Sequence, residues 1–303
     1  MPVPVAPGVV EIDTRLGGWE RVTAGYLVEG PEPVLVETGS QTSVPVLLDA
    51  LGGLGVGPDD LAAIVVTHVH LDHAGGVGDL ARAFPRATVY VHPLGARHLA
   101  EPGRLVASAA RVYGPLLDDL YGRLEPTPES RIRALADGDA IPIGPGRSLV
   151  ALHSPGHAKH HVALHDSATG LLFVGDAAGV HLPDVGVLRP AAPPPDFDLD
   201  QAVASLRRMA RRQPTAVVRA HYGVAVDPPD AVLAAAEEVL YRWAEVAEAA
   251  WRAGDSVEAA LEAAFATAGS AAGGRDAPME ALNGVASNAA GFRRWLEQRQ
   301  PRP

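Results

Sequence analysis

Four ionisable side chains follow one short apolar segment, and this arrangement constrains the chain more than any other part of its sequence. Residues 61–66 are apolar and typical of a buried strand, so the polar residues after them fall on the loop at its carboxyl end. Alternate residues of an extended or tightly turning loop point the same way, so the first two of these residues can face one metal ion, and the other two would then face a second position. Imidazole and carboxylate groups are ligands of zinc and other first-row metals. The two pairs are His68 with His70, and Asp72 with His73.

Three more polar residues stand farther along the chain in the same kind of position. Each one ends, or closely follows, a short run of apolar residues that is typical of a strand. Because strand ends converge at one edge of a layered α/β fold, we expect these side chains to join the first cluster. The three residues are His157, Asp176 and His221.

The order of these residues resembles that of the metallo-β-lactamase superfamily, with the glyoxalase II-like hydrolases as the nearest branch. The motifs are H-x-H-x-D-H at 68–73, S-P-G-H at 154–157, G-D at 175–176 and a late histidine, within a match from about Val9 to Tyr222. The resemblance implies a four-layer αβ/βα sandwich with metals at one edge between its sheets. It also implies the ligands: His68, His70 and His157 for a first metal, Asp72, His73 and His221 for a second, and Asp176 bridging both.

The same resemblance implies a dinuclear metal-dependent hydrolase, in which a hydroxide shared by two divalent metal ions attacks the substrate. Zn²⁺ is the expected metal, and iron and manganese stay open because they accept the same nitrogen and oxygen ligands. Asp72 is expected to orient the hydroxide, and Asp176 to offset the metal charge and carry a proton. Behind the ligands we expect His161 and Glu37; the family usually has aspartate in place of Glu37, a change that bears on ligand orientation but removes no ligand.

The substrate is the part of the function that the sequence constrains least. We expect a small-molecule ester, thioester or lactone, by analogy with the family. The C-terminal helices show no clear basic cluster that could bind glutathione. Acyl-homoserine lactonases of the superfamily have a tyrosine shortly after the bridging aspartate, and this chain has none after Asp176. The proline-stiffened loop that starts at residue 181 is expected to form a wall of the substrate pocket. The expected substrate contacts are His181, Arg189 and Tyr222.

Other functional classes stay open beside this hydrolase. Relatives of the same fold include phosphoester hydrolases and sulfur dioxygenases with a single iron. Diiron reductases commonly have glutamate where this chain has His70, so electron transfer is less favoured. A binding or regulatory protein that keeps the metals is the third class.

Composition narrows the classes of molecule that this protein is expected to bind. The formal net charge of −11 disfavours non-specific binding to nucleic acid, which depends on basic groups that release counterions from phosphates. The dense basic group at 207–212 is expected to be a solvated helix face. Cysteine is absent, which excludes disulfides and thiolate ligands. No residue pattern resembles a secretion signal or a membrane span, so we expect a cytoplasmic protein with a small-molecule substrate and neither nucleic acid nor membrane as partner.

The apolar periodicity predicts strands at 9–13, 23–28, 33–37 and 88–91, and helices at 43–54 and from residue 79 to 84. We expect a catalytic domain at 1–227 that contains a helical insertion at about 93–124. Residues 228–303 are predicted to form a helical extension, broken near Gly254 and at 269–277, that serves as a lid or a homodimer contact.

Overall fold

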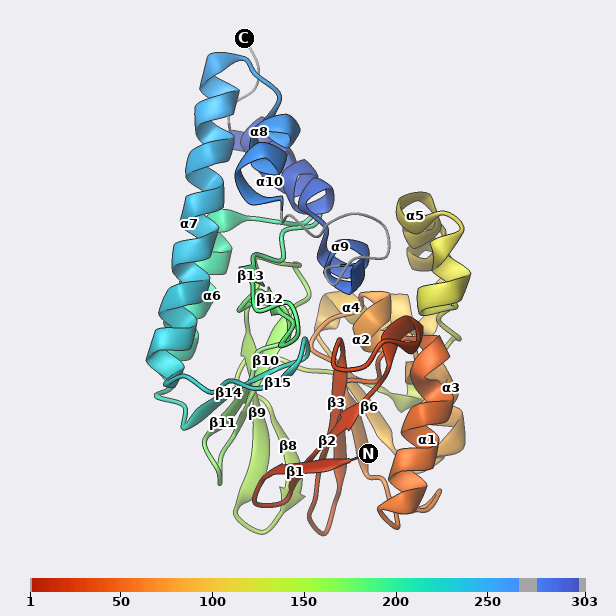
Figure 1. Ribbon diagram of the computed structural model, residues 1–303. Helices are drawn as coiled ribbons and strands as arrows, with labels where there is room; N and C mark the ends of the chain where they lie inside the picture. Colours follow the sequence, from red (N-terminus) through yellow and green to blue (C-terminus); the bar gives the residue numbers. More distant parts are fainter. Residues whose placement is uncertain (1, 267–276, 300–303) are drawn as a thin grey trace.

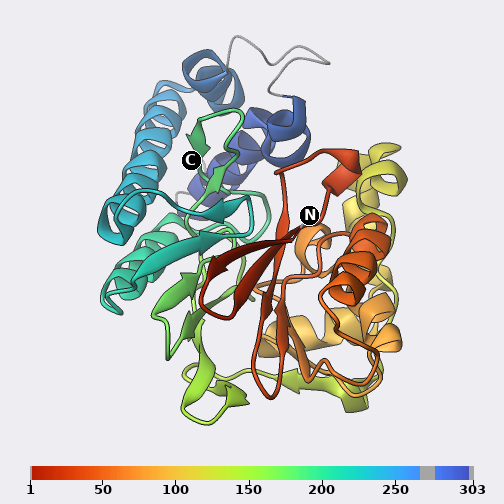
Figure 2. The same ribbon diagram turned by 60° about the horizontal axis from the view of Figure 1, so that its bottom comes forward.

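The protein is described by a computed structural model that covers residues 2–266 and 277–299. Two mixed sheets lie face to face in the middle of the molecule, and helices cover both outer faces (Figures 1 and 2). This arrangement confirms the predicted four-layer αβ/βα sandwich. The fold therefore has two edges at which strand ends from both sheets can meet.

The first sheet is built from the amino-terminal part of the chain, and its strands lie side by side in sequence order. Its second half is parallel, with Val36 beside Val65 in neighbouring strands. The strands are β1 (Val3–Ala6), β2 (Val9–Asp13), β3 (Ala24–Val28), β4 (Val34–Val36), β5 (Ala63–Val65), β6 (Thr88–Val91) and β7 (Ile132–Ala134). The helices between them are α1 (Val44–Gly53), α2 (Leu71–Ala74), α3 (Val77–Ala83), α4 (Pro93–Ala100) and α5 (Gly103–Tyr113), with the short turns η1 (Leu16–Gly18), η2 (Gln41–Ser43), η3 (Leu117–Tyr121) and η4 (Glu129–Arg131).

The second sheet runs in the order β15-β14-β11-β10-β9-β8, with β11 and β14 parallel. Its strands are β8 (Ala140–Gly144), β9 (Arg147–His153), β10 (Val162–Asp166), β11 (Leu171–Phe173), β14 (Ala216–Arg219) and β15 (Gly223–Val224). A separate hairpin consists of β12 (Val180–His181) and β13 (Leu188–Arg189). The helices of this half are α6 (Leu199–Ala210), α7 (Pro229–Ala253), α8 (Val257–Phe265), α9 (Ala277–Asn283) and α10 (Val285–Arg299).

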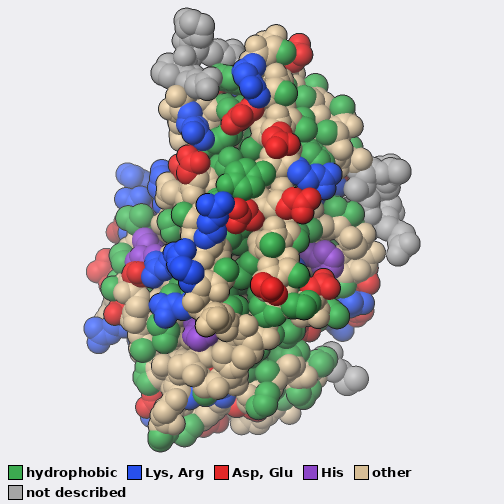
Figure 3. All heavy atoms as spheres, turned by 90° about the vertical axis from the view of Figure 1, so that its left-hand side faces the viewer, with side chains coloured by type: hydrophobic (Ala, Val, Ile, Leu, Met, Phe, Trp, Pro, Cys, Tyr) green, Lys and Arg blue, Asp and Glu red, His purple; other side chains and the backbone are tan. Residues whose placement is uncertain are grey.

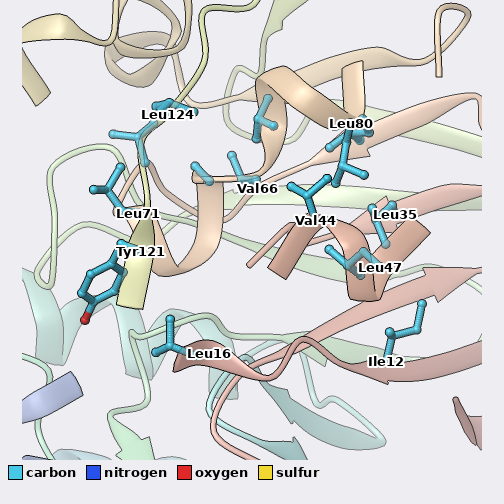
Figure 4. Close-up of a cluster of buried hydrophobic side chains, with 14 of the residues drawn as sticks. Ile12, Leu16, Leu35, Val44, Leu47, Val66, Leu71, Leu80, Tyr121 and Leu124 are labelled. Carbon is cyan, nitrogen blue, oxygen red and sulfur yellow. The ribbon is translucent and has the colours of Figure 1, made fainter. Parts of the chain in front are cut away.

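Both faces of the central strands are buried, which explains why these strands are apolar throughout rather than alternating. In β4, Val34 and Val36 point into the layer between the sheets, whereas Leu35 points outward to the helices. Figure 4 shows Leu35 packed towards Val44 and Leu47 of α1 in this outer cluster. Strand pleating alone thus divides consecutive residues between two separate cores.

The predicted strands and helices match the structure closely, and the differences are local. The sequence did not predict the edge strands β1, β7, β8 and β15, the short hairpin of β12 and β13, or β10 inside the second sheet. The expected break near Gly254 is confirmed, because α7 ends at Ala253 and Gly254 has φ 77°. The second expected break, at 269–277, lies almost entirely outside the described residues.

The helices of the extension pack on the second half of the sandwich. Helix α7 runs along α6, and α8 and α10 pack against α7 and each other (Figure 1). On the face formed by this side of the molecule, acidic and basic side chains are interspersed (Figure 3). Arg207 pairs with Glu237, and Arg208 with Asp137, so much of the basic group is neutralised by neighbours. No helix within residues 2–266 and 277–299 is both long and apolar enough to cross a membrane.

Candidate metal centre

The ligand loop lies between β5 and the short helix α2. His70 is the residue before the first turn of α2, and Asp72 and His73 belong to that turn. The other ligand candidates come from β9, β11 and β14 of the second sheet, each just beyond the strand end. Because β11 and β14 are parallel, Asp176 and His221 reach the same edge of the sandwich as the ligand loop.

Three imidazoles form the first group. The facing nitrogens of His68, His70 and His157 are 2.9–3.1 Å apart. Three nitrogens on a tetrahedral zinc at ordinary bond lengths are separated by about 3.3 Å. His157 donates from Nδ1 to the carbonyl oxygen of Ala191 at 2.9 Å, and its Nε2 therefore presents a lone pair to the group. These residues fit a metal ion.

A second group lies beside the first. Nε2 of His73 is 3.2 Å from Nε2 of His221, and both are within 3.5 Å of Oδ2 of Asp72. The opposite nitrogen of each histidine is used elsewhere: His221 Nδ1 donates to the carbonyl oxygen of Val22, and His73 Nδ1 donates to the Glu37 carboxylate. Each ring is thus turned so that its free nitrogen points into the group.

Asp176 faces both groups at once. Its Oδ1 lies 3.2 Å from Nε2 of His73 and of His221, while its Oδ2 lies 3.5 Å from Nε2 of His157. Oδ1 is buried between these two histidine nitrogens. A carboxylate shared by two sets of ligand nitrogens, with a buried oxygen left for coordination, is the arrangement expected of a bridging ligand.

A family model of the metallo-β-lactamase superfamily matches residues 17–221, the span that contains all seven of these side chains. The chain belongs to the metallo-β-lactamase superfamily. The metallo-β-lactamase fold-containing protein ST1585 of Sulfurisphaera tokodaii is 31% identical over 215 residues, which are 68% of this chain and 79% of that protein. The crystal structure of ST1585 superposes with a TM-score of 0.69 at 24% identity, covering 94% of this chain and 98% of the other.

Two relatives in the superfamily carry the names of hydrolases. A hydroxyacylglutathione hydrolase of Aeromonas salmonicida is 35% identical over 130 residues, 43% of this chain and 37% of that enzyme. The acyl-coenzyme A thioesterase MBLAC2 of Gallus gallus is 30% identical over 190 residues, 57% of this chain and 64% of that protein. The chain spans less than two thirds of the length of either. The family membership agrees with the expected enzyme class, a metal-dependent hydrolase of this superfamily.

Two residues expected behind the ligands lie there. Glu37 is buried; its Oε1 accepts from the Thr67 backbone at 2.8 Å and its Oε2 accepts from His73 at 2.9 Å. His161 accepts from the backbone N–H of Asp176 at 3.2 Å, so its other nitrogen donates to Ser154 Oγ at 2.8 Å. Glutamate in place of the superfamily's usual aspartate thus still makes contact with a ligand.

The glycine of the G-D motif makes this close packing possible. Gly175 has φ 49°, a left-handed conformation that residues with a Cβ adopt at a cost. A Cβ at this position would lie 2.6 Å from His161 Nε2 and from Thr67 Oγ1. The motif therefore places the backbone before Asp176 directly against His161 and Thr67.

The two groups of ligands differ in charge in the metal-free protein. Burial lowers the pKa of the three imidazoles in the first group, for His70 to about 3. Burial also acts to lower the pKa of His73 and His221, but Asp72 and Asp176 outweigh it and raise the pKa of His221 to about 9. At neutral pH the first group is neutral and the second carries protonated histidines.

Metal binding should therefore release protons from one side only. Ligand nitrogens must be deprotonated, so filling both positions at pH 7 should release about two protons, from His73 and His221. Affinity of the second group should fall as pH falls below about 9, whereas that of the first group, whose imidazoles have lowered pKa values, should depend less on pH. Calorimetry in buffers of different ionisation enthalpy measures this release. Binding without proton release would contradict the assigned charges.

Glu37→Gln should weaken metal binding at the second group by about 10–100-fold, the usual effect of losing a partner behind a ligand histidine. The amide has nearly the size of the carboxylate, but it cannot accept from both the Thr67 N–H and His73 Nδ1–H. Metal titration of the metal-free variant measures the change. Glu37→Asp keeps the charge and is the matched control; equal losses in both variants would show that side-chain length, not charge, governs affinity.

The three expected substrate contacts are placed differently from one another. His181 is half-buried, at the end of β12. Arg189 is 1% exposed and pairs with Glu280 of α9 at 2.6 Å, and it lines a cavity together with His157 and Asp176. Tyr222 is partly buried against the core between the sheets, where burial and the Glu11 carboxylate raise its pKa. Substrate contact by these residues stays a prediction.

The structure adds three residues that the sequence analysis did not select. The ring of His160 lies 5.9 Å from that of His70, and its Nδ1 is buried and unpaired within the described residues. The rings of Tyr113 and Tyr121 are 4.4 Å apart, and burial and the Asp72 carboxylate raise the pKa of Tyr113 to about 12. Figure 4 shows the Tyr121 hydroxyl directed away from the apolar cluster that holds its ring. Of these three residues, only His160 could have been suspected from the sequence, because it stands next to His161.

Proposed function

We propose that this protein is a dinuclear metal-dependent hydrolase that cleaves a small-molecule thioester, ester or lactone. The single observation that carries the proposal is the position of Asp176, whose two oxygens face different histidine groups. Such a carboxylate joins two three-residue sets into one centre. We propose zinc for both positions, because the set contains only imidazole and carboxylate ligands and zinc accepts both.

When bound, the two cations supply a water of lowered pKa, about 7, and polarise the oxygen of the scissile group. The protein itself supplies orientation. Burial alone would raise the pKa of Asp72, but His73 and His221 outweigh burial, lower this pKa and keep the carboxylate ionised. Its side chain is 11% exposed, compared with 1% for the two histidines, so it is the member of the second group that faces the opening. Asp72 thus accepts a hydrogen bond from the attacking water and directs it.

Two features support acyl substrates. Both hydrolase relatives are named for thioesters, a hydroxyacylglutathione and an acyl-coenzyme A. The helical insertion places Tyr113 close enough to Asp72 for that carboxylate to raise the pKa of its phenol, and a neutral phenol can donate to a carbonyl oxygen. The insertion, α2 and α9 lie at the same end of the sandwich (Figure 1).

Hydrolysis assays with zinc-reconstituted protein test the proposal. The panel comprises acyl-coenzyme A and S-acylglutathione thioesters, aryl esters, homoserine lactones and, as the competing class, phosphate diesters. We expect zinc-dependent turnover of at least one acyl substrate and loss of that turnover in Asp176→Ala. Turnover confined to phosphate diesters, or oxygen consumption by an iron-loaded protein without hydrolysis, would overturn it.

A further inference from the structure

A short segment, residues 189–192, lies between a metal ligand and the C-terminal helices. On one side, the carbonyl oxygen of Ala191 accepts the Nδ1–H of His157 at 2.9 Å. On the other side, the N–H of Ala192 donates to Oδ1 of Asn288 in α10 at 2.6 Å. One residue earlier, the carbonyl oxygen of Pro190 accepts from Nδ2 of Asn283 in α9 at 3.0 Å.

The first two hydrogen bonds belong to a single peptide unit. The carbonyl of Ala191 and the N–H of Ala192 share one rigid plane, in which they point in opposite directions. Holding the N–H therefore fixes the direction of the carbonyl. Asn288 and His157 are 131 residues apart in sequence, yet only one planar group separates them.

The asparagine side chains are themselves fixed. Asn288 is 1% exposed, and its Nδ2 donates to Oδ1 of Asn283 at 2.8 Å. The Ala192 N–H can only donate, so the amide oxygen of Asn288 must be the atom that faces it. Gly291 brings α10 close enough for this contact, since a Cβ at that position would lie 1.6 Å from the carbonyl oxygen of Ala192. The helix thus packs directly onto the segment that holds His157.

We propose that Asn288, supported by Asn283, is a positioning residue for the first metal. By orienting the peptide unit between Ala191 and Ala192, it sets the tautomer and the direction of the His157 ring. Partners behind a ligand histidine typically change metal affinity by about 10–100-fold. The C-terminal helices then contribute to the metal centre without supplying a ligand. The inference rests on the two-metal centre of the proposed function.

Zinc titration of metal-free protein against a chromophoric competitor tests this role. His157→Ala and His221→Ala first identify which of two binding constants belongs to each group. Asn288→Ala should weaken the constant that His157→Ala removes by about 10–100-fold and leave the other within about threefold. The control is Leu296→Ala, which removes a buried side chain of the same helix from the apolar cluster shared with α7. It should lower the melting temperature and change neither constant selectively.

The outcomes separate the inference from the proposed function. If the unaltered protein does not bind two zinc ions, the dinuclear function fails. If it binds two and Asn288→Ala changes neither constant, or weakens both as Leu296→Ala does, only the positioning role is overturned. Should Asn288→Ala not fold, Asn283→Ala removes the bond to Pro190 and should weaken the same constant by a smaller factor. An unchanged constant in that variant also contradicts the inference.

Discussion

Asp72→Ala should lower turnover by about 10²–10⁴-fold, the range typical of losing a positioned acid–base group, with little change in KM. The carboxylate contacts both histidines of the second group and is the more exposed member of it. Its loss removes an interaction made in the transition state, while the surfaces that bind the substrate stay in place. Steady-state kinetics on the acyl substrate that the panel identifies measures both parameters.

The control for this prediction is Asp79→Ala. Asp79 lies on α3, where its carboxylate contacts Gln41 and Arg82 instead of the ligand histidines. Its removal changes the net charge by the same amount and should leave turnover within about twofold, as expected for a site apart from the centre. Full turnover in Asp72→Ala would remove that residue from the mechanism.

Chelation of the metals should lower the melting temperature by roughly 8–16 °C. A ligand present at 1,000 times its Kd stabilises the folded state by about 4 kcal/mol, and each kcal/mol shifts the melting temperature of a domain of this order by roughly 2–4 °C. The metal-free centre holds two buried carboxylates, a third that is 11% exposed, and five buried or partly buried imidazoles close together. Scanning calorimetry with and without chelator measures the shift.

The metal-free protein should also be stable only over a narrow pH range. The pKa of His70 is lowered to about 3, so the unfolded chain binds a proton that the folded chain cannot, and stability falls as pH decreases from about 6.5 towards 3. The pKa of His221 is raised to about 9, so its contribution is present below about 6.5 and is lost as pH rises through 9. A melting temperature independent of chelator at every pH would contradict a metal centre.

Sequence reasoning located the ligands because each stands at a strand end, and parallel strands end at one edge. His157, Asp176 and His221 needed no knowledge of loops beyond that rule. The role of Glu37 came from the resemblance to the superfamily, and the structure places it directly after the buried strand β4. In these places local pattern and global fold agree.

Contacts that depend on packing between distant segments could not be predicted. Arg189 belongs to the segment that was expected to line the substrate pocket, but its ion-pair partner Glu280 lies 91 residues away in α9. Tyr113 and Tyr121 lie within electrostatic range of Asp72 only because the insertion folds back towards the ligand loop, which no periodicity encodes. Asn288 belongs to no sequence motif, because its role depends on the hydrogen bond that it accepts from the distant Ala192 N–H.

Metal content, measured by elemental analysis of protein produced with both iron and zinc available, decides whether the centre is dinuclear. We expect two zinc ions per chain, and weakened binding of both in Asp176→Ala, because that carboxylate faces both groups. Activity should follow the zinc content on removal and readdition. A single tightly held iron per chain, unaffected by zinc, would contradict the dinuclear hydrolase.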